Sequence, residues 1–496
     1  MHLVSRHSPI RASPPADSRM LHTGVILLTA SLLLWPAFWN VYPLVFSDTG
    51  TYLTQAIHRY LGWDRPVFYS LFLYPLHLQQ TLWPPIIAQA VLAAWLLHLL
   101  RRVLLPESPA WVLLAHTAFL AILTALPFVV SQLMPDVFTS MLVIAIALTV
   151  LTPERLSRTE AGLLLPITSF MIVAHQSHVA LSFALLLGLL PLRRLLGAEI
   201  VSNVRENTRF SFWRSRAWLW RAILPLPLAC VALVSVNLVG HGRASLSPFG
   251  NVFLLARLIY DGPGRVALER NCPQSGWRLC AALDHLPPTS DEFLWRADSP
   301  LVELGGAKIV SAEAGAIILA AIRESPGAVL RGFTANAAAQ FARFATGDGL
   351  QPWPDTVTPA IVQDFPRAEA AAYAAARQQR ADPPFPDASL EGSLLPGPFV
   401  VLHLAAASAG ICGAVLVLIR GVRRNHVAAG FAAAALLAVL ANAAITGGLS
   451  GPHDRYQSRI VWLPLAVACF AVPALATRRQ PPVYLVSPPI ALLPSG

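Results

Sequence analysis

Two short polar segments follow the first long apolar stretch of the chain: Phe46-Ser-Asp-Thr-Gly-Thr-Tyr-Leu53 and Gly62-Trp-Asp-Arg-Pro-Val-Phe-Tyr69. They contain Asp48 and Asp64, although the chain keeps almost all of its acidic residues out of apolar sequence. Ionisable groups beside membrane-like segments are costly and usually carry function. The two segments therefore predict a polar loop, residues 46–83, that holds a functional site at the edge of a helical membrane core.

The composition supports a membrane protein. Of 496 residues, 55% are hydrophobic and 12% are charged, and the mean hydropathy is +0.56. These values are typical of a chain with many membrane spans and exclude an ordinary soluble protein. The net charge of +10 is an arginine excess, because Lys308 is the sole lysine. We interpret the excess as an orientation signal and expect no nucleic-acid partner, since no basic stripe is interleaved with aromatic residues.

Ten apolar stretches are long enough to cross a bilayer, which takes about 20 residues per helix. The fold class predicted is therefore an all-α polytopic membrane protein with about ten transmembrane helices. Two of the stretches, 160–175 and 179–196, are short and could form a broken or re-entrant pair. The ten stretches are 21–45, 84–104, 110–131, 136–152, 160–175, 179–196, 217–240, 398–420, 426–449 and 459–477.

The arginines predict the orientation of these spans. With the N-terminus in the cytoplasm, the cytoplasmic segments hold 19 arginines and the short outer loops hold four, as the positive-inside rule requires. We expect a bacterial inner (plasma) membrane protein whose active face is periplasmic. The predicted parts are a cytoplasmic tail (1–20), a transmembrane core (21–240) with the outer loop 46–83, a periplasmic loop domain (241–397), C-terminal transmembrane helices (398–477) and a second cytoplasmic tail (478–496).

The long outer loop, residues 241–397, differs in composition from the spans, being rich in Pro, Asp and Gly. It is long enough for a small folded domain, which we expect to be mostly helical and irregular. Ala312–Ile322 and Ala328–Phe344 have helical patterns. Cys272 and Cys280 lie in this loop and could pair, which would suit an oxidising exterior.

Three aspartates are candidate site residues on the outer face: Asp48, Asp64 and Asp136. Each has a structural alternative. Asp48 and Asp136 each precede a helical pattern and could be N-caps. Asp64 and Arg65 could form a local ion pair that shapes the turn before Pro66.

The basic candidates on the same face are Arg65, His175, His178, Arg455 and Arg459. The two histidines share a helix face, but no third metal ligand is evident, so hydrogen bonding in a polar pocket competes with metal binding. Arg455 and Arg459 could anchor the last span at the membrane interface, or one of them could bind phosphate, for which a guanidinium offers paired donors. We predict no metal site, although a divalent metal could assist.

At these residues the chain resembles the C-type (GT-C) membrane glycosyltransferases, which use polyprenyl-phosphate-linked sugars. The resemblance rests on Ser47-Asp48-Thr49 after the first span, Asp64-Arg65-Pro66 before the next helices, Pro135-Asp136 and Asp454-Arg455-Tyr456. It covers roughly residues 20–200 in layout and 450–475 more weakly. Many relatives have two adjacent acids in the first loop, whereas here Thr49 follows Asp48.

The resemblance implies transfer of a sugar from a polyprenyl-phosphate donor to a glycan or lipid acceptor at the outer face, with inversion. Asp48 would be the general base, and Arg455 or Arg459 would neutralise the departing phosphate, with Arg65 in reserve. Asp64, Asp136, His175 and His178 would help to bind the substrates, beside membrane lipids. The alternatives are a lipid-linked glycan transporter or flippase, and a non-catalytic polysaccharide-assembly subunit. Repeat symmetry and mid-span charges, which are typical of transporters, are not evident in the sequence.

Overall fold

The computed structural model describes residues 16–201, 211–380 and 397–476. Within these ranges every regular element is a helix, and the β pairing is one isolated bridge between Leu44 and Gln132. Most of the predicted tail 1–20 and all of the predicted tail 478–496 lie outside the described residues. The all-helical fold class is confirmed for the described part.

Five helical stretches are long and apolar enough to cross a membrane, as expected for a helical membrane protein. They are α5 (Trp83–Leu104), residues Ser177–Leu196 of α10 (Ser177–Val201), Ala217–His241 across α11 (Ser211–Ile223) and α12 (Pro225–His241), α22 (Gly397–Arg424) and α23 (His426–Leu449). The other five predicted spans are also helical, but they are shorter, broken or charged at one end. The count of ten therefore stays a prediction. The helices in these other five predicted spans are α1 (Ala16–Leu33), α2 (Trp35–Asn40), α6 (Trp111–Leu123), α7 (Leu126–Ser131), α8 (Val137–Leu151), α9 (Arg158–Ala174) and α24 (Asp454–Ala476).

The two ends of the helical bundle differ in charge. At one end Arg102 pairs with Glu160 at 2.6 Å. Arg155 donates to the carbonyl of Val103 at 2.6 Å, so the arginines there hold neighbouring helix ends together. Asp136, His175 and His178 lie at the opposite end of these helices, where α8 and α10 begin. The arginine-rich segments and the candidate site are thus on opposite sides of the bundle.

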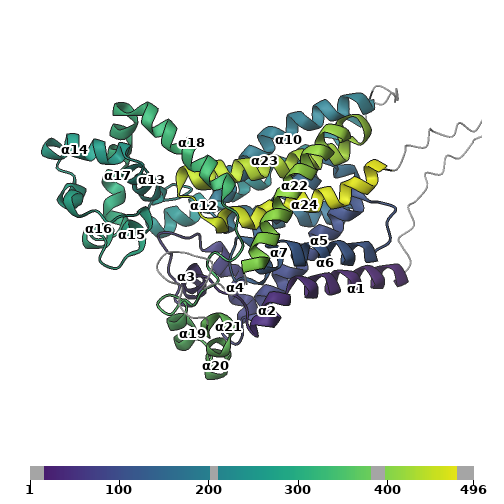
Figure 1. The fold of residues 1–496 in the computed structure, drawn as a ribbon, viewed down its shortest axis with the longest axis horizontal. Helices are drawn as coiled ribbons and strands as arrows, with labels where there is room; N and C mark the ends of the chain where they lie inside the picture. Colours follow the sequence, from purple (N-terminus) through teal and green to yellow (C-terminus); the bar gives the residue numbers. More distant parts are fainter. Residues whose placement is uncertain (1–15, 202–210, 381–396, 477–496) are drawn as a thin grey trace, which may run out of the picture.

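The described residues of the long outer loop form two parts. The first part has its own hydrophobic core, which includes Val252, Phe293 and Ile317, and it projects beyond the bundle (Figure 1). Cys272 and Cys280 form a disulfide in it. We call this part the lobe. It comprises α13 (Gly250–Tyr260), α14 (Pro263–Ser275), the 3-10 segment Arg278–His285, α15 (Ser290–Trp295), α16 (Pro300–Glu303) and α17 (Ala307–Glu324).

Helix α18 (Pro326–Ala342) leads from the lobe back to the bundle and packs along α23. Close approach is possible because Gly447 and Gly448 present no side chain there; a Cβ on Gly448 would lie 2.2 Å from the ring of Phe333. The helix predicted at 312–322 is confirmed as part of α17, and the one predicted at 328–344 is confirmed as α18, which ends two residues earlier at Ala342.

The second part of the long loop packs against the first outer loop. It contains α19 (Thr358–Asp364), α20 (Arg367–Ala375) and α21 (Arg377–Arg380), which lie beside α3 (Ser47–Ile57) below the bundle (Figure 1). The buried carboxylate of Glu369 accepts from the Tyr42 hydroxyl at 2.6 Å and from the backbone N–H of Leu82 at 2.9 Å. These bonds fix the ends of the first outer loop, which also contains α4 (Phe68–His77).

Gly50 sits in the middle of α3 because the second part of the long loop passes directly over it. A Cβ at this position would lie 2.0 Å from the carbonyl oxygen of Thr356. Glycine inside a helix normally costs stability relative to alanine, so its presence here reflects the close approach of α3 and the chain before α19.

We expect Gly50→Ala to lower the free energy of unfolding by about 1–3 kcal/mol, because the methyl group overlaps backbone that cannot move away easily. Thermal unfolding of the detergent-purified protein measures this. Gly162→Ala is the matched control: it lies in α9 with nothing within 4 Å of its Cβ position, so a small stabilisation is expected there. Equal melting temperatures for the two variants would contradict the close packing.

Candidate functional site

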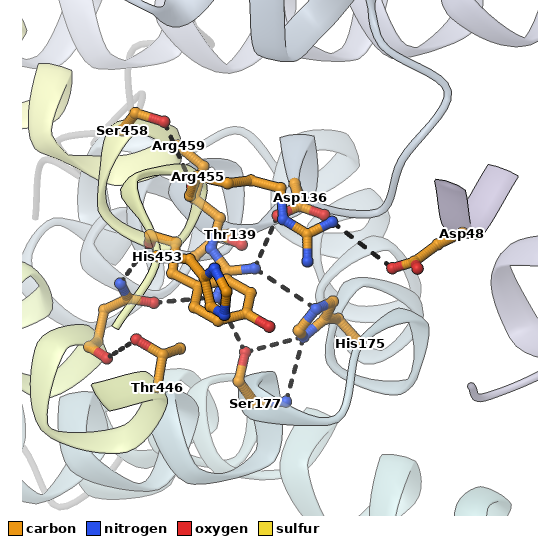
Figure 2. Close-up of polar contacts among 12 residues, drawn as sticks. Asp48, Asp136, Thr139, His175, Ser177, Thr446, His453, Arg455, Ser458 and Arg459 are labelled. Atoms are coloured by element: carbon orange, nitrogen blue, oxygen red, sulfur yellow. Dashed lines mark hydrogen bonds and ion pairs between the residues drawn. The ribbon is translucent and has the colours of Figure 1, made fainter. Parts of the chain in front are cut away.

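The site lies where the first turns of α3 and α24 meet the segments that precede α8 and α10. Figure 2 shows Asp48, Asp136, His175, Arg455 and Arg459 converging from these four places. Arg65 joins them from the chain between α3 and α4 through an ion pair with Asp48. Asp64, which also pairs with Arg65, completes a cluster of three carboxylates and three guanidinium groups, so the formal charge of the cluster is balanced. Site residues that lie far apart in the sequence, and that were predicted one by one, are therefore in contact.

Asp48 is not the N-cap of α3, so that alternative interpretation is wrong. Phe46 occupies the cap position, and the Thr49 hydroxyl accepts its backbone N–H at 2.9 Å. The Asp48 carboxylate is thereby free for other contacts. One oxygen pairs with Arg65 and the other lies 3.5 Å from Nη1 of Arg455.

Arg65 holds the first outer loop together at the site. It pairs with Asp64 at 3.2 Å as well as with Asp48. The predicted ion pair between Asp64 and Arg65 therefore exists, but Arg65 also binds a second carboxylate. Its guanidinium also lies 5.2 Å from the ring centroid of Trp295, which the lobe supplies. Burial, together with the neighbouring carboxylate of Asp48, raises the pKa of the Asp64 carboxyl above its ordinary value, although Arg65 opposes the shift.

Arg459 and Asp136 form a buried ion pair with an N–O distance of 3.0 Å. Asp136 stands at the N-cap position of α8 but makes no side-chain cap bond, because its carboxylate turns to Arg459. Arg459 is 0% exposed and also donates to Asn442 at 3.1 Å and Ser177 at 3.3 Å. Both of its terminal nitrogens donate to protein groups, and Nε alone has no partner among the described residues, so little donor capacity is left for a substrate phosphate.

Arg455, one turn earlier, is arranged differently. Its backbone N–H donates to Asp348 at 2.9 Å, and its guanidinium lies 3.8 Å from the ring centroid of Phe46. Apart from the looser contact with Asp48, Nη1 makes no hydrogen bond with the described residues. Of the two predicted phosphate ligands, Arg455 is therefore the one with donor capacity to spare.

Arg455 lines a small pocket that we call the α24 cavity. A second polar group, Oδ2 of Asp136, is buried there without a hydrogen-bond partner among the described residues. The cavity thus offers both an unused donor and an unused acceptor. Its polar lining includes Gln132, Asp136, Thr346, Asp348, Arg455, Ser458 and Arg459.

Arg65 lines a separate small pocket, which we call the α12 cavity. It lies where the outer end of α12 meets the first outer loop, with Gly240 packed against Leu61. Its lining includes Trp63, Arg65, Gln176, Val236, Asn237 and His241.

The two predicted histidines support the site but do not form a metal centre. His178 is fully buried and uses both ring nitrogens, contacting Thr139 at 2.8 Å and the carbonyl of Met171 at 2.6 Å. His175 contacts Arg459 at 3.4 Å and the Ser177 hydroxyl at 2.9 Å. Among the described residues, no group of three or more His, Cys, Asp or Glu side chains is placed to hold a metal ion.

Several site residues were missed by the sequence analysis. Asn442 had a usable signal, because it is a lone amide in the middle of the Ala-rich span of α23. Asp348 and Phe46 had none: Asp348 lies in an irregular stretch 107 residues before Arg455, and Phe46 looks like ordinary apolar sequence. Long-range contacts of this kind leave no local pattern.

No family model, curated protein or solved structure matches the chain. The resemblance to the C-type glycosyltransferases therefore stays a prediction from the short motifs, and function has to be argued from the site itself.

Replacing Arg459 with methionine should destabilise the protein by about 3–5 kcal/mol, because Asp136 would be left buried and unpaired. The fall in the melting temperature of the detergent-purified variant measures this. Arg455→Met is the comparison, and we expect a much smaller loss there because the contact with Asp48 is looser. In the double variant Asp136→Leu/Arg459→Met, much of the stability should return. An Arg459→Met protein as stable as the wild type would contradict the buried pair.

The raised pKa of Asp64 makes its ionised form unfavourable in the folded protein. This cost is absent below the ordinary pKa of about 3.9 and develops as pH rises through the raised value. We therefore expect Asp64→Asn to raise the melting temperature at neutral pH, by an amount that shrinks as pH falls to 4. Melting curves between pH 4 and 8 test the sign. A difference that grows toward acid would contradict it.

Proposed function

We propose that the protein is a membrane glycosyltransferase that moves a sugar from a polyprenyl-phosphate donor to an outer-face glycan or lipid acceptor, with inversion. One observation carries the proposal. The Asp48 carboxylate contacts two arginines, and each arginine lines a different cavity. A transfer reaction needs two substrates brought to one base from two sides, and this arrangement supplies that geometry.

We place the phosphate of the donor beside the α24 cavity, because of the polar groups that line it. The spare donor capacity of Arg455 suits an anionic phosphate, while the unpartnered Oδ2 of Asp136 needs a hydrogen-bond donor such as a sugar hydroxyl. Ser458 adds a hydroxyl to the lining. A ligand that had a phosphate without a hydroxyl group, or a hydroxyl group without a phosphate, would leave one of the two buried polar groups unsatisfied.

In the proposed reaction, the oxygen of an acceptor hydroxyl attacks the anomeric carbon of the donor sugar and forms the new glycosidic bond. The bond between that carbon and the phosphate oxygen breaks, and its electron pair leaves with the polyprenyl phosphate. Asp48 accepts the hydroxyl proton; a positioned carboxylate suffices because the leaving group is good. Arg455 stabilises the charge that develops on the phosphate.

The other predicted site residues position the groups that contact the substrates. Arg65 and Asp64 position Asp48, His175 and Arg459 position Asp136, and His178 fixes Thr139 at the start of α8. Each of these carboxylates is paired with an arginine. Carboxylates paired in this way do not suit a divalent cation as ligands, so the proposed reaction uses no metal ion.

We also propose that this end of the bundle faces the periplasm of a bacterial inner membrane, with about ten spans. The arginine-rich helix ends at the opposite side support this orientation. The disulfide in the lobe supports an oxidising exterior.

Asp48→Asn should lower sugar transfer by about 10²–10⁴-fold, because the amide cannot accept the hydroxyl proton. The assay uses proteoliposomes, a panel of radiolabelled polyprenyl-phosphate sugars and a mixture of glycan and lipid acceptors, with the melting temperature checked alongside. Asp355→Asn, an exposed site on the same outer part, is the matched control and should keep wild-type activity. Unchanged transfer by Asp48→Asn would refute the base assignment. No transfer by the wild type with any pair would favour a transporter or an assembly subunit.

A further inference from the structure

The guanidinium of Arg455 lies against an aromatic ring. Its central carbon is 3.8 Å from the centroid of the Phe46 ring, over the ring face, whereas the ring of Tyr456 is farther away at 5.0 Å. The face of an aromatic ring carries partial negative charge and attracts a cation within about 6 Å of the centroid. The Phe46 ring is therefore a close restraint on this guanidinium, beside the looser contact with Asp48.

The Phe46 ring is itself fixed by the chain before α19. Gly349, whose φ is +81°, passes so close that a Cβ there would lie 2.3 Å from carbon atoms of the ring. The ring of Trp353 packs on that of Phe46 with centroids 5.0 Å apart, and its indole N–H donates to the Gly349 carbonyl at 3.2 Å. Turning the ring away from Arg455 would require this segment to move as well.

The backbone that carries Arg455 is fixed independently of Phe46. Asp348 accepts the backbone N–H of Arg455 at 2.9 Å. Two residues earlier, the buried amide of Gln340 accepts from the N–H of His453 at 2.9 Å and donates to its carbonyl at 2.8 Å. The freedom that remains belongs to the long side chain of Arg455, which has many rotamers. A contact at the guanidinium end, such as that with Phe46, limits this freedom most directly.

A ring face restrains a guanidinium without using its hydrogen-bond donors. The attraction comes from the charge distribution of the ring, so the contact leaves the N–H groups of arginine free to donate. Accordingly, Nη1 of Arg455 has no hydrogen-bond partner among the described residues. Arg459 is the contrast, since it is held by hydrogen bonds from both terminal nitrogens. An arginine that must be fixed and yet bind an anion needs the first kind of contact.

We propose that Phe46 is a positioning residue for Arg455: its ring holds the guanidinium in place for the donor phosphate and leaves the N–H groups free to bind it. This inference rests on the proposed transferase function and extends it by saying how the phosphate-binding arginine is held. Phe46 acts through Arg455 and not on the substrate itself. The role differs from simple packing, because it depends on the electrons of the ring as well as on its shape.

The test changes the electrons of the ring and leaves its shape nearly unaltered. Amber suppression replaces Phe46 with mono-, di- or trifluorophenylalanine, and each fluorine weakens the attraction of the ring face for a cation. Isothermal titration calorimetry of the detergent-purified protein measures the Kd for farnesyl phosphate, with farnesol as the probe that lacks the phosphate. We expect the Kd for farnesyl phosphate to rise stepwise, by about three- to tenfold for the trifluoro ring, and the Kd for farnesol to stay constant.

Two controls separate positioning from packing. The same substitutions at Phe249, whose ring centroid lies 5.1 Å from the guanidinium carbon of Arg243 outside the site, should leave the Kd for farnesyl phosphate unchanged. In Arg455→Met, the series at Phe46 should have no effect, because no guanidinium remains to be held. An equal rise in Kd in Arg455→Met, or no rise with Arg455 present, would overturn the inference. Equal affinity of the wild type for farnesyl phosphate and farnesol would also overturn it.

The transfer assay distinguishes failure of this inference from failure of the proposed function. In a transferase, kcat/KM should fall across the Phe46 series in the same order as the affinity for farnesyl phosphate. Stepwise weakening of phosphate binding, together with no transfer by the wild type, would uphold the hold of Phe46 on a phosphate-binding Arg455 and overturn the transferase proposal. Transfer that is equally efficient with every ring in the series would overturn the inference.

Discussion

The buried ion pair between Arg459 and Asp136 is the interaction on which the outer end of the bundle depends. Neither charge could be buried alone, because the desolvation cost of an unpaired ion is several kcal/mol. The pair joins the start of α8 to the second turn of α24, and Asn442 and Ser177 complete the coordination of the guanidinium from α23 and α10. Four helices are thereby fixed at one depth, which gives the remaining charges defined positions.

With that pair in place, two arginines one turn apart on the same helix have different uses. Arg459 points into the bundle, where protein groups accept hydrogen bonds from both of its terminal nitrogens. Arg455 points toward the first outer loop, where its partners are an aromatic face and a carboxylate at 3.5 Å. The first arrangement is structural and rigid, while the second leaves binding capacity at the surface of a cavity. The division follows from helix geometry, since residues four apart share a face but meet different neighbours along the axis.

The long outer loop contributes to the site in two ways. The lobe places Trp295 against Arg65, and the chain before α19 passes over Gly50 and supplies Asp348 to the backbone of Arg455. The first outer loop is thus held between the lobe and the second part of the long loop. A loop of 46–83 alone, exposed to water, would let Asp48 and Arg65 move independently; packing on both sides restricts them to one geometry, as a positioned base requires.

The sequence by itself determined the helical membrane character, the polar loop after the first apolar stretch and the identity of most of the charged residues at the site. These follow from local properties: hydropathy over about 20 residues, and the high cost of placing an aspartate or arginine beside apolar sequence without a reason. The pairing of the charges, and the contact of Asp48 with two arginines that line different pockets, became visible only in the folded chain. Those outcomes depend on contacts such as Asp48 with Arg455 and Asp136 with Arg459, which span hundreds of residues. The energy of an ion pair is set by distance and burial in space, and neither quantity is encoded in the local order of residues.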